Sequence, residues 1–197
     1  MKEMYIIPNN KIVFSILPNA VSIERTTIIV YPLQGIDISG VGQINLGQPK
    51  SAIENILGKP DSHSDANLWF YDAYECRIDF DESDEVAFIE FIYGPFPERI
   101  QLTLYGIDPF RIGADNLVEI LSAKNAGEID DREAGYSYGF VNISVGISRD
   151  IMEKDAEELI AEKKESGDYE YDRTWLEEEL DKSRNFSTIG IGKVGYY

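Results

Sequence analysis

Residues 44–61 have the sequence INLGQPKSAIENILGKPD, and this stretch decides how the rest of the chain is interpreted. Pro49 suits the first turn of a helix, because a first-turn residue has no intrahelical use for the amide hydrogen that proline lacks. A stripe of apolar residues with helical spacing follows, namely Ala52, Ile53, Ile56 and Leu57. Gly58 can end the helix and Pro60 prevents its continuation. The stretch therefore predicts a short amphipathic helix over residues 49–57.

An antiparallel meander is predicted immediately after this helix. Residues 68–71 are aromatic and apolar, which is typical of a strand. In residues 74–80 apolar and polar side chains alternate, as they do in a strand with one buried and one solvated face. An acidic turn over residues 81–84 leads to a third strand over residues 86–93. Helix and meander together form one structural unit.

The same order of patterns then recurs in the second half of the chain. It predicts a strand, a helix and two further strands, over residues 100–104, 114–121, 136–140 and 141–147. The helix segment IENIL at residues 53–57 aligns with LVEIL at residues 117–121, and Ile78 aligns with Val141 at nearly the same offset. The recurrence indicates an internal duplication with a degenerate second copy.

These patterns set the expected fold class and domain boundaries. We expect an α+β protein made of two tandem helix-plus-antiparallel-sheet units, the first over residues 42–98 and the second over residues 99–197. Residues 1–41 are expected to form N-terminal strands and a glycine-rich loop. Residues 150–184 contain 14 acidic and 6 basic residues with two narrow apolar stripes. They predict an insertion of two exposed acidic helices in the second unit.

Composition narrows the class of function. The 197 residues include 36 acidic and 18 basic side chains, for a net charge of −18. This balance argues against nucleic acid and against an anionic membrane surface, and it favours a basic protein partner. A single Cys excludes an internal disulfide, and no signal-peptide pattern or 20-residue apolar span is found. We therefore expect a cytoplasmic protein with no metal and no cofactor.

Three features of the sequence are candidate chemical sites. His63 lies in the polar segment of residues 61–65, which fits a solvated loop better than a catalytic base. Cys76 falls on the apolar side of an alternating strand, where a thiol usually acts as a small hydrophobic group. Residues 79–85 resemble the start of a calcium loop, but Asp84 stands where that loop needs glycine. We expect no enzymatic activity; a carboxylate-dependent, glycosidase-like hydrolase is the alternative from another class.

Aromatic residues on the expected strands suggest a binding surface. Tyr and Trp serve protein interfaces well, because their rings are apolar and their polar atoms accept water or a partner. We predict partner binding on an open sheet face that combines these aromatic residues with nearby charges, namely Trp69, Tyr71, Tyr74, Glu75, Arg77, Asp79, Tyr136 and Tyr138. The acidic segment of residues 150–184 is the rival surface.

The first unit also resembles a known repeat. Residues 44–61 lead through a Gly-containing turn and a helix to LGKPD, and LWFY at residues 68–71, CRIDFD at residues 76–81 and VAFI at residues 86–89 follow. This order is similar to the repeat unit of the beta-lactamase inhibitor protein family, which small outer-membrane assembly lipoproteins share. The lipid-acceptor Cys of those lipoproteins has no counterpart here, so their function is not implied.

The whole chain looks more like cytoplasmic bacterial immunity proteins of polymorphic toxins, which carry two such units. The resemblance implies a non-catalytic inhibitor that neutralises a basic toxin domain by covering its active site. A scaffold or adaptor protein with another partner would explain the acidity and the duplication equally well.

Overall fold

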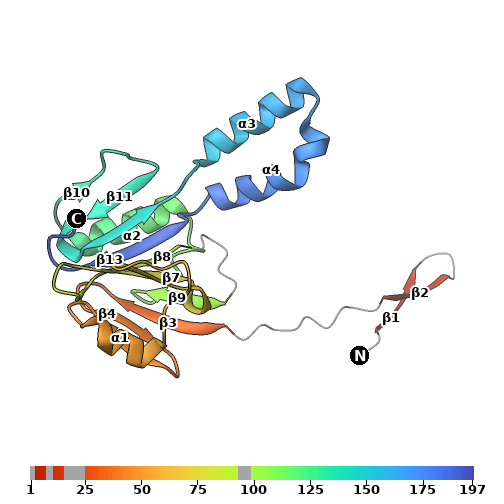
Figure 1. The fold of residues 1–197 in the computed structure, drawn as a ribbon. Coiled ribbons are helices and arrows are strands. Elements are labelled where there is room, and N and C mark those ends of the chain that lie inside the picture. The colour runs from red at the N-terminus through yellow and green to blue at the C-terminus, as the bar shows by residue number, and fades with distance from the viewer. Residues whose placement is uncertain (1–2, 8–10, 16–24, 93–98) are drawn as a thin grey trace.

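Two β-sheets sharing one hydrophobic core form the body of the protein (Figure 1). The computed structural model describes residues 3–7, 11–15, 25–92 and 99–197. The first two of these ranges are β1 (Glu3–Ile7) and β2 (Lys11–Ser15), which pair with each other in antiparallel fashion. The architecture is α+β, which confirms the fold class expected from the sequence.

The larger sheet has seven strands in the order β10-β11-β12-β13-β8-β7-β6. Every neighbouring pair is antiparallel. In chain order its strands are β6 (Leu68–Tyr71), β7 (Cys76–Phe80), β8 (Val86–Phe91), β10 (Ile129–Asp130), β11 (Ser137–Phe140), β12 (Val145–Ser148) and β13 (Thr188–Gly192). Alternation decides the two faces: Cys76, Ile78 and Phe80 are buried toward the core, whereas Arg77 and Asp79 lie on the opposite, outer face.

The smaller sheet has four strands in the order β5-β4-β3-β9. They are β3 (Thr26–Tyr31), β4 (Gly35–Ile38), β5 (Gly42–Asn45) and β9 (Ile100–Leu104). The glycine-rich segment of residues 35–48, expected as a loop or a short irregular strand, forms two strands. β3 and β9 pair in parallel, which local patterns did not predict because the two strands are far apart in the chain. Residues 1–41 supply β3 and β4 of this sheet, residues 42–98 supply β5 and residues 99–197 supply β9, so all three expected segments contribute to it.

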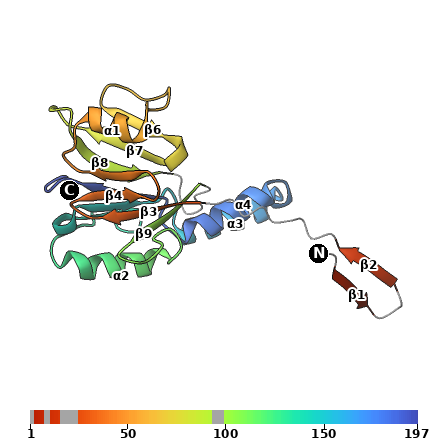
Figure 2. The same ribbon diagram turned by 90° about the horizontal axis from the view of Figure 1, so that it is seen from below.

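Two helices complete the layer that covers the inner face of the seven-stranded sheet. α1 (Lys50–Leu57) lies beside β5, and α2 (Ala114–Asn125) lies against β11. Figure 2 shows the helices on opposite sides of the four-stranded sheet. Ile53 on α1 and Leu117 on α2 are completely buried, as expected for the apolar stripe of an amphipathic helix.

The same local structure occurs twice in the seven-stranded sheet. β6 and β7 are joined by η1 (Asp72–Tyr74), and β11 and β12 are joined by η2 (Val141–Ile143). Each 3₁₀ turn ends at a left-handed residue, Glu75 with φ 49° and Ser144 with φ 47°. β8 and β13 then follow and pair with each other at the centre of the sheet. The two halves of the sheet are thus arranged around a pseudo-twofold axis between β8 and β13.

The structural correspondence corrects the alignment made from sequence. Val141 lies in a 3₁₀ turn, so it cannot match Ile78 in a strand. Ile78 is three residues after the left-handed Glu75, and Ile147 is three residues after the left-handed Ser144. Ile147 is therefore the residue of the second unit that is equivalent to Ile78. A constant offset fails because α2 has 12 residues where α1 has 8, which shifts every later element.

A helical arm projects from the body between β12 and β13. It consists of α3 (Glu153–Ser166) and α4 (Tyr169–Ser183), and Gly167 ends α3 with a φ of 86°. Figure 1 shows the arm rising on the side of β10 and β11, away from α1. Lys163 on α3 and Asp172 on α4 form an ion pair with an N–O distance of 2.6 Å. The arm occupies the place that a short turn has between β7 and β8, as expected of an insertion in the second unit.

We predict that the body folds without the arm. β12 and β13 are adjacent antiparallel strands with Ser148 opposite Thr188, so a short turn can join them. Replacing residues 150–184 by Asn-Gly should preserve cooperative thermal unfolding and the circular dichroism of the sheet, because Phe186 stays in the core. A variant without cooperative unfolding would show that the arm is part of the folding unit.

Candidate protein-binding surfaces

Trp69 and Tyr71 lie on the core side of the seven-stranded sheet, which corrects their expected place on an open face. Cross-strand partners share a face, and Trp69 and Tyr71 are opposite Ile78 and Cys76. Tyr71 is only 4% exposed, and its hydroxyl donates a hydrogen bond to the carbonyl oxygen of Gly58 at 3.2 Å. Burial is the main cause that raises the pKa of Tyr71 above its ordinary value. These rings stabilise the core and cannot anchor a partner.

The other expected binding residues are also divided among different places. Tyr74 packs against the core, and buried Glu75 accepts a hydrogen bond from the Arg99 amide at 3.1 Å. Tyr138 is half-buried and its hydroxyl accepts a hydrogen bond from the Gly135 amide. Tyr136 is 38% exposed at the base of the arm. Of the predicted set, the structure brings together only Arg77 and Asp79 on the outer face of the sheet.

Arg77 and Asp79 belong to a small charged cluster that also contains Glu90. The Arg77 Nε atom lies 3.3 Å from Asp79 Oδ1 and 3.1 Å from Glu90 Oε2. Burial raises the pKa of both carboxyl groups, against the opposing effect of the Arg77 charge. Next to the cluster, Phe88 stacks on Tyr196 with a centroid separation of 4.4 Å. The cluster is therefore partly covered by the protein's own aromatic residues.

A single cross-strand row runs over the outer face from β10 to β6. In order, the row contains Asp130, Gly139, Gly146, Gly190, Glu90, Arg77 and Phe70. Three adjacent glycines, Gly139, Gly146 and Gly190, form a trough with no side chains on its floor; we call it the glycine trough. Carboxylates stand at both of its ends, Asp130 on one side and Glu90 on the other.

Tyr197 fills part of the glycine trough. A Cβ atom added to Gly146 would lie 2.0 Å from the Tyr197 hydroxyl oxygen, and one added to Gly139 would lie 3.1 Å from the Tyr197 ring. A Cβ atom on Gly190 would meet the Phe88 ring at 2.2 Å. The glycines are thus required by the close approach of aromatic rings rather than by backbone conformation. Burial, the largest cause, raises the pKa of the Tyr197 phenol.

The pseudo-twofold axis relates the trough to a region of the first unit that carries large side chains instead of glycines. The glycines occupy the positions that correspond to Phe70, Arg77 and Glu90 in the first unit. One half of the outer face therefore carries large side chains, and the other half is hollow. The alternating glycines of β13 and Gly139 in β11 are the sequence signal for this hollow half. Their role becomes clear only when the strands are paired, because they come from different parts of the chain.

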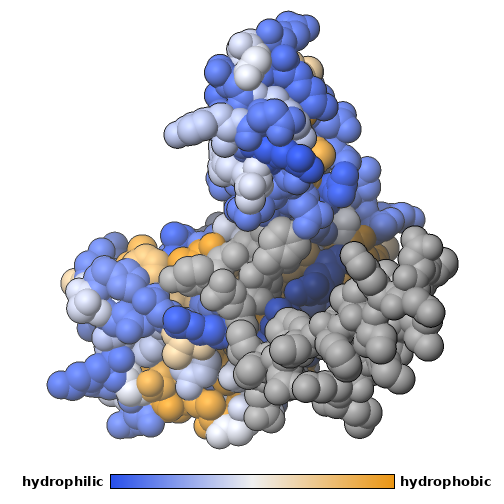
Figure 3. Space-filling model, turned by 90° about the vertical axis from the view of Figure 1, so that its right-hand side faces the viewer, coloured by the Kyte–Doolittle hydropathy of each residue, from blue (hydrophilic) through white to orange (hydrophobic). Residues whose placement is uncertain are grey.

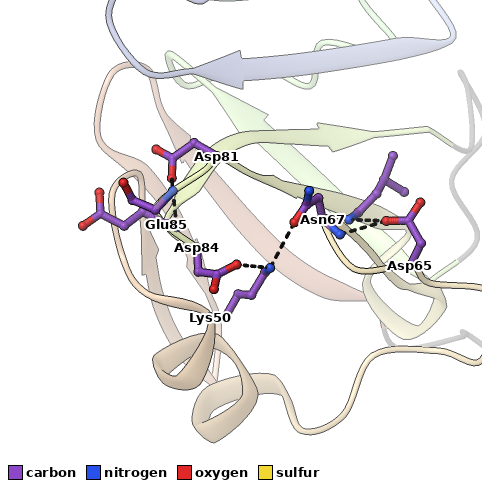
Figure 4. Close-up of polar contacts among 8 residues, drawn as sticks. Lys50, Asp65, Asn67, Asp81, Asp84 and Glu85 are labelled. Carbon is purple, nitrogen blue, oxygen red and sulfur yellow. Dashed lines mark hydrogen bonds and ion pairs between the residues drawn. The ribbon is translucent and has the colours of Figure 1, made fainter.

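The β7–β8 turn has polar contacts that organise the first unit (Figure 4). Asp81 Oδ1 accepts hydrogen bonds from the Ser83 and Glu85 amides at 2.9 and 3.1 Å. Asp84 pairs with Lys50 at the start of α1, and Lys50 also donates to Asn67 Oδ1 at 3.2 Å. The carboxylates of this acidic turn thus bind different protein donors instead of converging on one centre. Within the described residues no group of three potential metal ligands is found.

The arm presents the most exposed aromatic residues in the described part of the chain. Tyr171 is 94% exposed and Trp175 is 49% exposed. They lie four residues apart on α4, so they share one face of the helix. Figure 3 shows the projecting arm as a largely hydrophilic surface. The exposed carboxylates of Glu162, Glu165, Glu170 and Glu178 make no ion pair within the described residues.

Several contacts hold the base of the arm on the body. The Tyr136 hydroxyl donates a 2.6 Å hydrogen bond to Asp155 on α3. Arg184 pairs with Glu153 at 2.9 Å, which joins the two ends of the arm. The Arg149 guanidinium donates to the carbonyl oxygens of Gly135 and Ser183 at 2.6 and 2.8 Å. The arm is therefore presented in a defined direction.

The candidate catalytic groups do not form a recognisable active site. His63 is half-exposed and lies 3.6 Å from Asp72, with its ring against Phe70. Cys76 is completely buried, and burial raises the pKa of its thiol to about 12. Glu90 and Asp130 face one trough, but four strand spacings separate β8 from β10, which is roughly 19 Å between backbones. Glycosidase carboxyl groups are about 5–10 Å apart.

Comparison with protein-family models, with curated proteins and with solved structures returned no significant match. In the described part of the chain, none of the helices has the length and apolar character needed to cross a membrane.

We predict that Asp81→Asn destabilises the protein in a pH-dependent way. The hydrogen bond from Lys193 (2.7 Å) is the main cause that lowers the pKa of Asp81. A carboxyl group with a lowered pKa stabilises the fold above its unfolded pKa of about 3.9, and this contribution is lost as the pH falls through the folded pKa. Asn keeps one oxygen for the turn. Chemical denaturation should show a stability deficit at pH 7 that shrinks below pH 4, with exposed Glu82→Gln as the control.

The glycine trough predicts a coupling between Gly146 and Tyr197. Gly146→Ala should cost about 1–3 kcal/mol, because the new methyl group overlaps the Tyr197 ring. In a Tyr197→Ala background the same change should be neutral or slightly stabilising, since alanine restricts the unfolded chain more than glycine does. A double-mutant cycle in urea measures the coupling. Additive effects would show that Tyr197 does not occupy the trough in solution.

Proposed function

We propose that this protein is a non-catalytic binding protein that captures a basic protein domain through its acidic arm. The observation that carries the proposal is the exposed pair Tyr171 and Trp175 on a projecting, strongly acidic helical hairpin. By the resemblance of the whole chain to immunity proteins with two such units, the partner is a toxin domain and the protein acts as its immunity protein.

Charge supports a basic partner. Residues 150–184 carry a net charge of −8, from 14 acidic and 6 basic residues. Four of the basic residues are already paired with carboxylates, namely Lys163, Arg173, Lys182 and Arg184. The remaining acidic residues give the arm a negative potential that accelerates encounter with a cationic surface.

The aromatic pair Tyr171 and Trp175 supplies the binding affinity that exposed charges do not provide. Exposed salt bridges contribute little affinity, whereas Trp and Tyr that become buried in an interface often dominate it. Tyr171 and Trp175 lie on the side of α4 away from buried Leu176, so they are free to enter a partner. Tyr71 on β6 cannot do this because it is buried in the core, and Trp69 packs against that core.

A matched pair of variants tests the arm as a binding surface. The partner to use is the basic domain encoded beside this gene, with binding measured by surface plasmon resonance. Tyr171→Ala and Trp175→Ala should each weaken binding by roughly 2 kcal/mol, mainly through faster dissociation. The association rate should fall steeply with added salt.

Tyr31→Ala is the control, because Tyr31 is 41% exposed on the four-stranded sheet, away from the arm. Equal binding by all three variants would remove the arm from the interface. Rescue of cells that express the toxin domain distinguishes an immunity protein from a scaffold: a scaffold would bind without restoring growth. A neighbouring gene that encodes no basic domain would contradict the immunity assignment.

A further inference from the structure

A cavity of about 600 Å³ remains open beside Tyr197 at the glycine trough. Its walls include the side chains of Glu90, Asp130 and Glu133, and the Tyr197 ring forms one side. Ser148 and Thr188 add hydroxyl groups that hydrogen-bond to each other at 2.6 Å. The cavity is thus flat-floored, partly aromatic and lined with oxygen acceptors.

The cavity lining has more negative than positive charge. Arg132 is its one cationic side chain, and it is bound to Asp130 by two hydrogen bonds of 2.9 and 2.6 Å. Glu133 accepts a hydrogen bond from the neutral Ser137 hydroxyl and shares the Arg132 charge with Asp130. Glu90 shares the single guanidinium of Arg77 with Asp79 and is hydrogen-bonded to the side chain of Thr188. A cation entering the cavity would therefore meet carboxylates that lack a full counter-charge.

We propose that this cavity receives an arginine side chain of the basic partner, stacked on Tyr197 and paired with Glu90. The inference rests on the proposed function and adds the residue type that the partner must present. Arginine fits better than lysine, because its planar guanidinium stacks on aromatic rings and donates several hydrogen bonds at once. The glycine floor is itself in contact with Tyr197 and Phe88, and the open volume beside the Tyr197 ring is large enough for such a plane.

The cavity is continuous with the arm. Ser148 ends β12 and Thr188 begins β13, so the two wall residues stand where the arm leaves the sheet. The β10–β11 segment that contributes Glu133 also carries Tyr136, whose hydroxyl is bonded to Asp155 on α3. One basic surface that contacts the arm can therefore place an arginine in the cavity.

The test uses the full chain and a defined probe, the peptide acetyl-Gly-Arg-Gly-amide. In a ¹H–¹⁵N NMR titration, the amide signals of Gly139, Gly146 and Gly190 should shift, and the matching citrulline peptide should leave them unchanged. Glu90→Gln should weaken binding of the arginine peptide at least about tenfold, or by about 1.4 kcal/mol. Glu82→Gln in the exposed β7–β8 turn is the matched control and should have no effect on it.

Three results would overturn the inference: no shifts at the trough glycines, equal shifts with citrulline, or unchanged binding by Glu90→Gln. If Glu90→Gln fails to fold, Tyr197→Leu decides, because it keeps an apolar side chain but removes the stacking ring. If the arginine peptide does not bind but Tyr171→Ala still weakens binding of the partner, the cavity is rejected and the arm is retained. If the peptide binds at the trough but Tyr171→Ala leaves partner binding unchanged, the arm is rejected and the cavity is retained.

Discussion

The pairing of β8 with β13 is the contact on which the rest of the structure depends. It places Ile89 opposite Ile191 and Glu90 opposite Gly190. It also joins a three-stranded half, β6 to β8, and a four-stranded half, β10 to β13, into one sheet. The continuous inner face can then be covered by α1, α2 and the four-stranded sheet around one core. The same pairing puts the charged cluster of the first unit next to the glycine trough of the second. Both proposed binding surfaces therefore depend on how these two strands are aligned.

Local sequence patterns predicted the local elements well. The strands β6 and β9 have the bounds that the sequence indicated, and α1 begins one residue later than expected. Long-range features were missed, above all the parallel pairing of β3 with β9, because no pattern within a strand reveals a distant partner. The face of Trp69 was also misjudged. Alternation separates the two faces of a strand, but only the covering layer decides which face is buried.

The two halves of the seven-stranded sheet share a backbone and differ in what they display. In the first half, a short acidic turn closes β7 and β8, and its carboxylates are used to hold α1 and Lys193. In the second half, the turn is replaced by the arm and the outward side chains are replaced by glycines. The second unit therefore carries the arm and the glycine trough, which have no counterpart in the first unit. Both proposed binding surfaces lie in this half of the molecule.

The insertion point of the arm has a consequence for how such a protein can change over time. α3 and α4 bury few of their own side chains, among them Ala156 and Leu176, and most of their outward positions are exposed. Substitutions at these exposed positions change the charge and shape of the arm without disturbing the packing of the two sheets. Under the proposed function, binding specificity can therefore change through the sequence and length of the arm, while the packed residues of the two sheets continue to hold the fold.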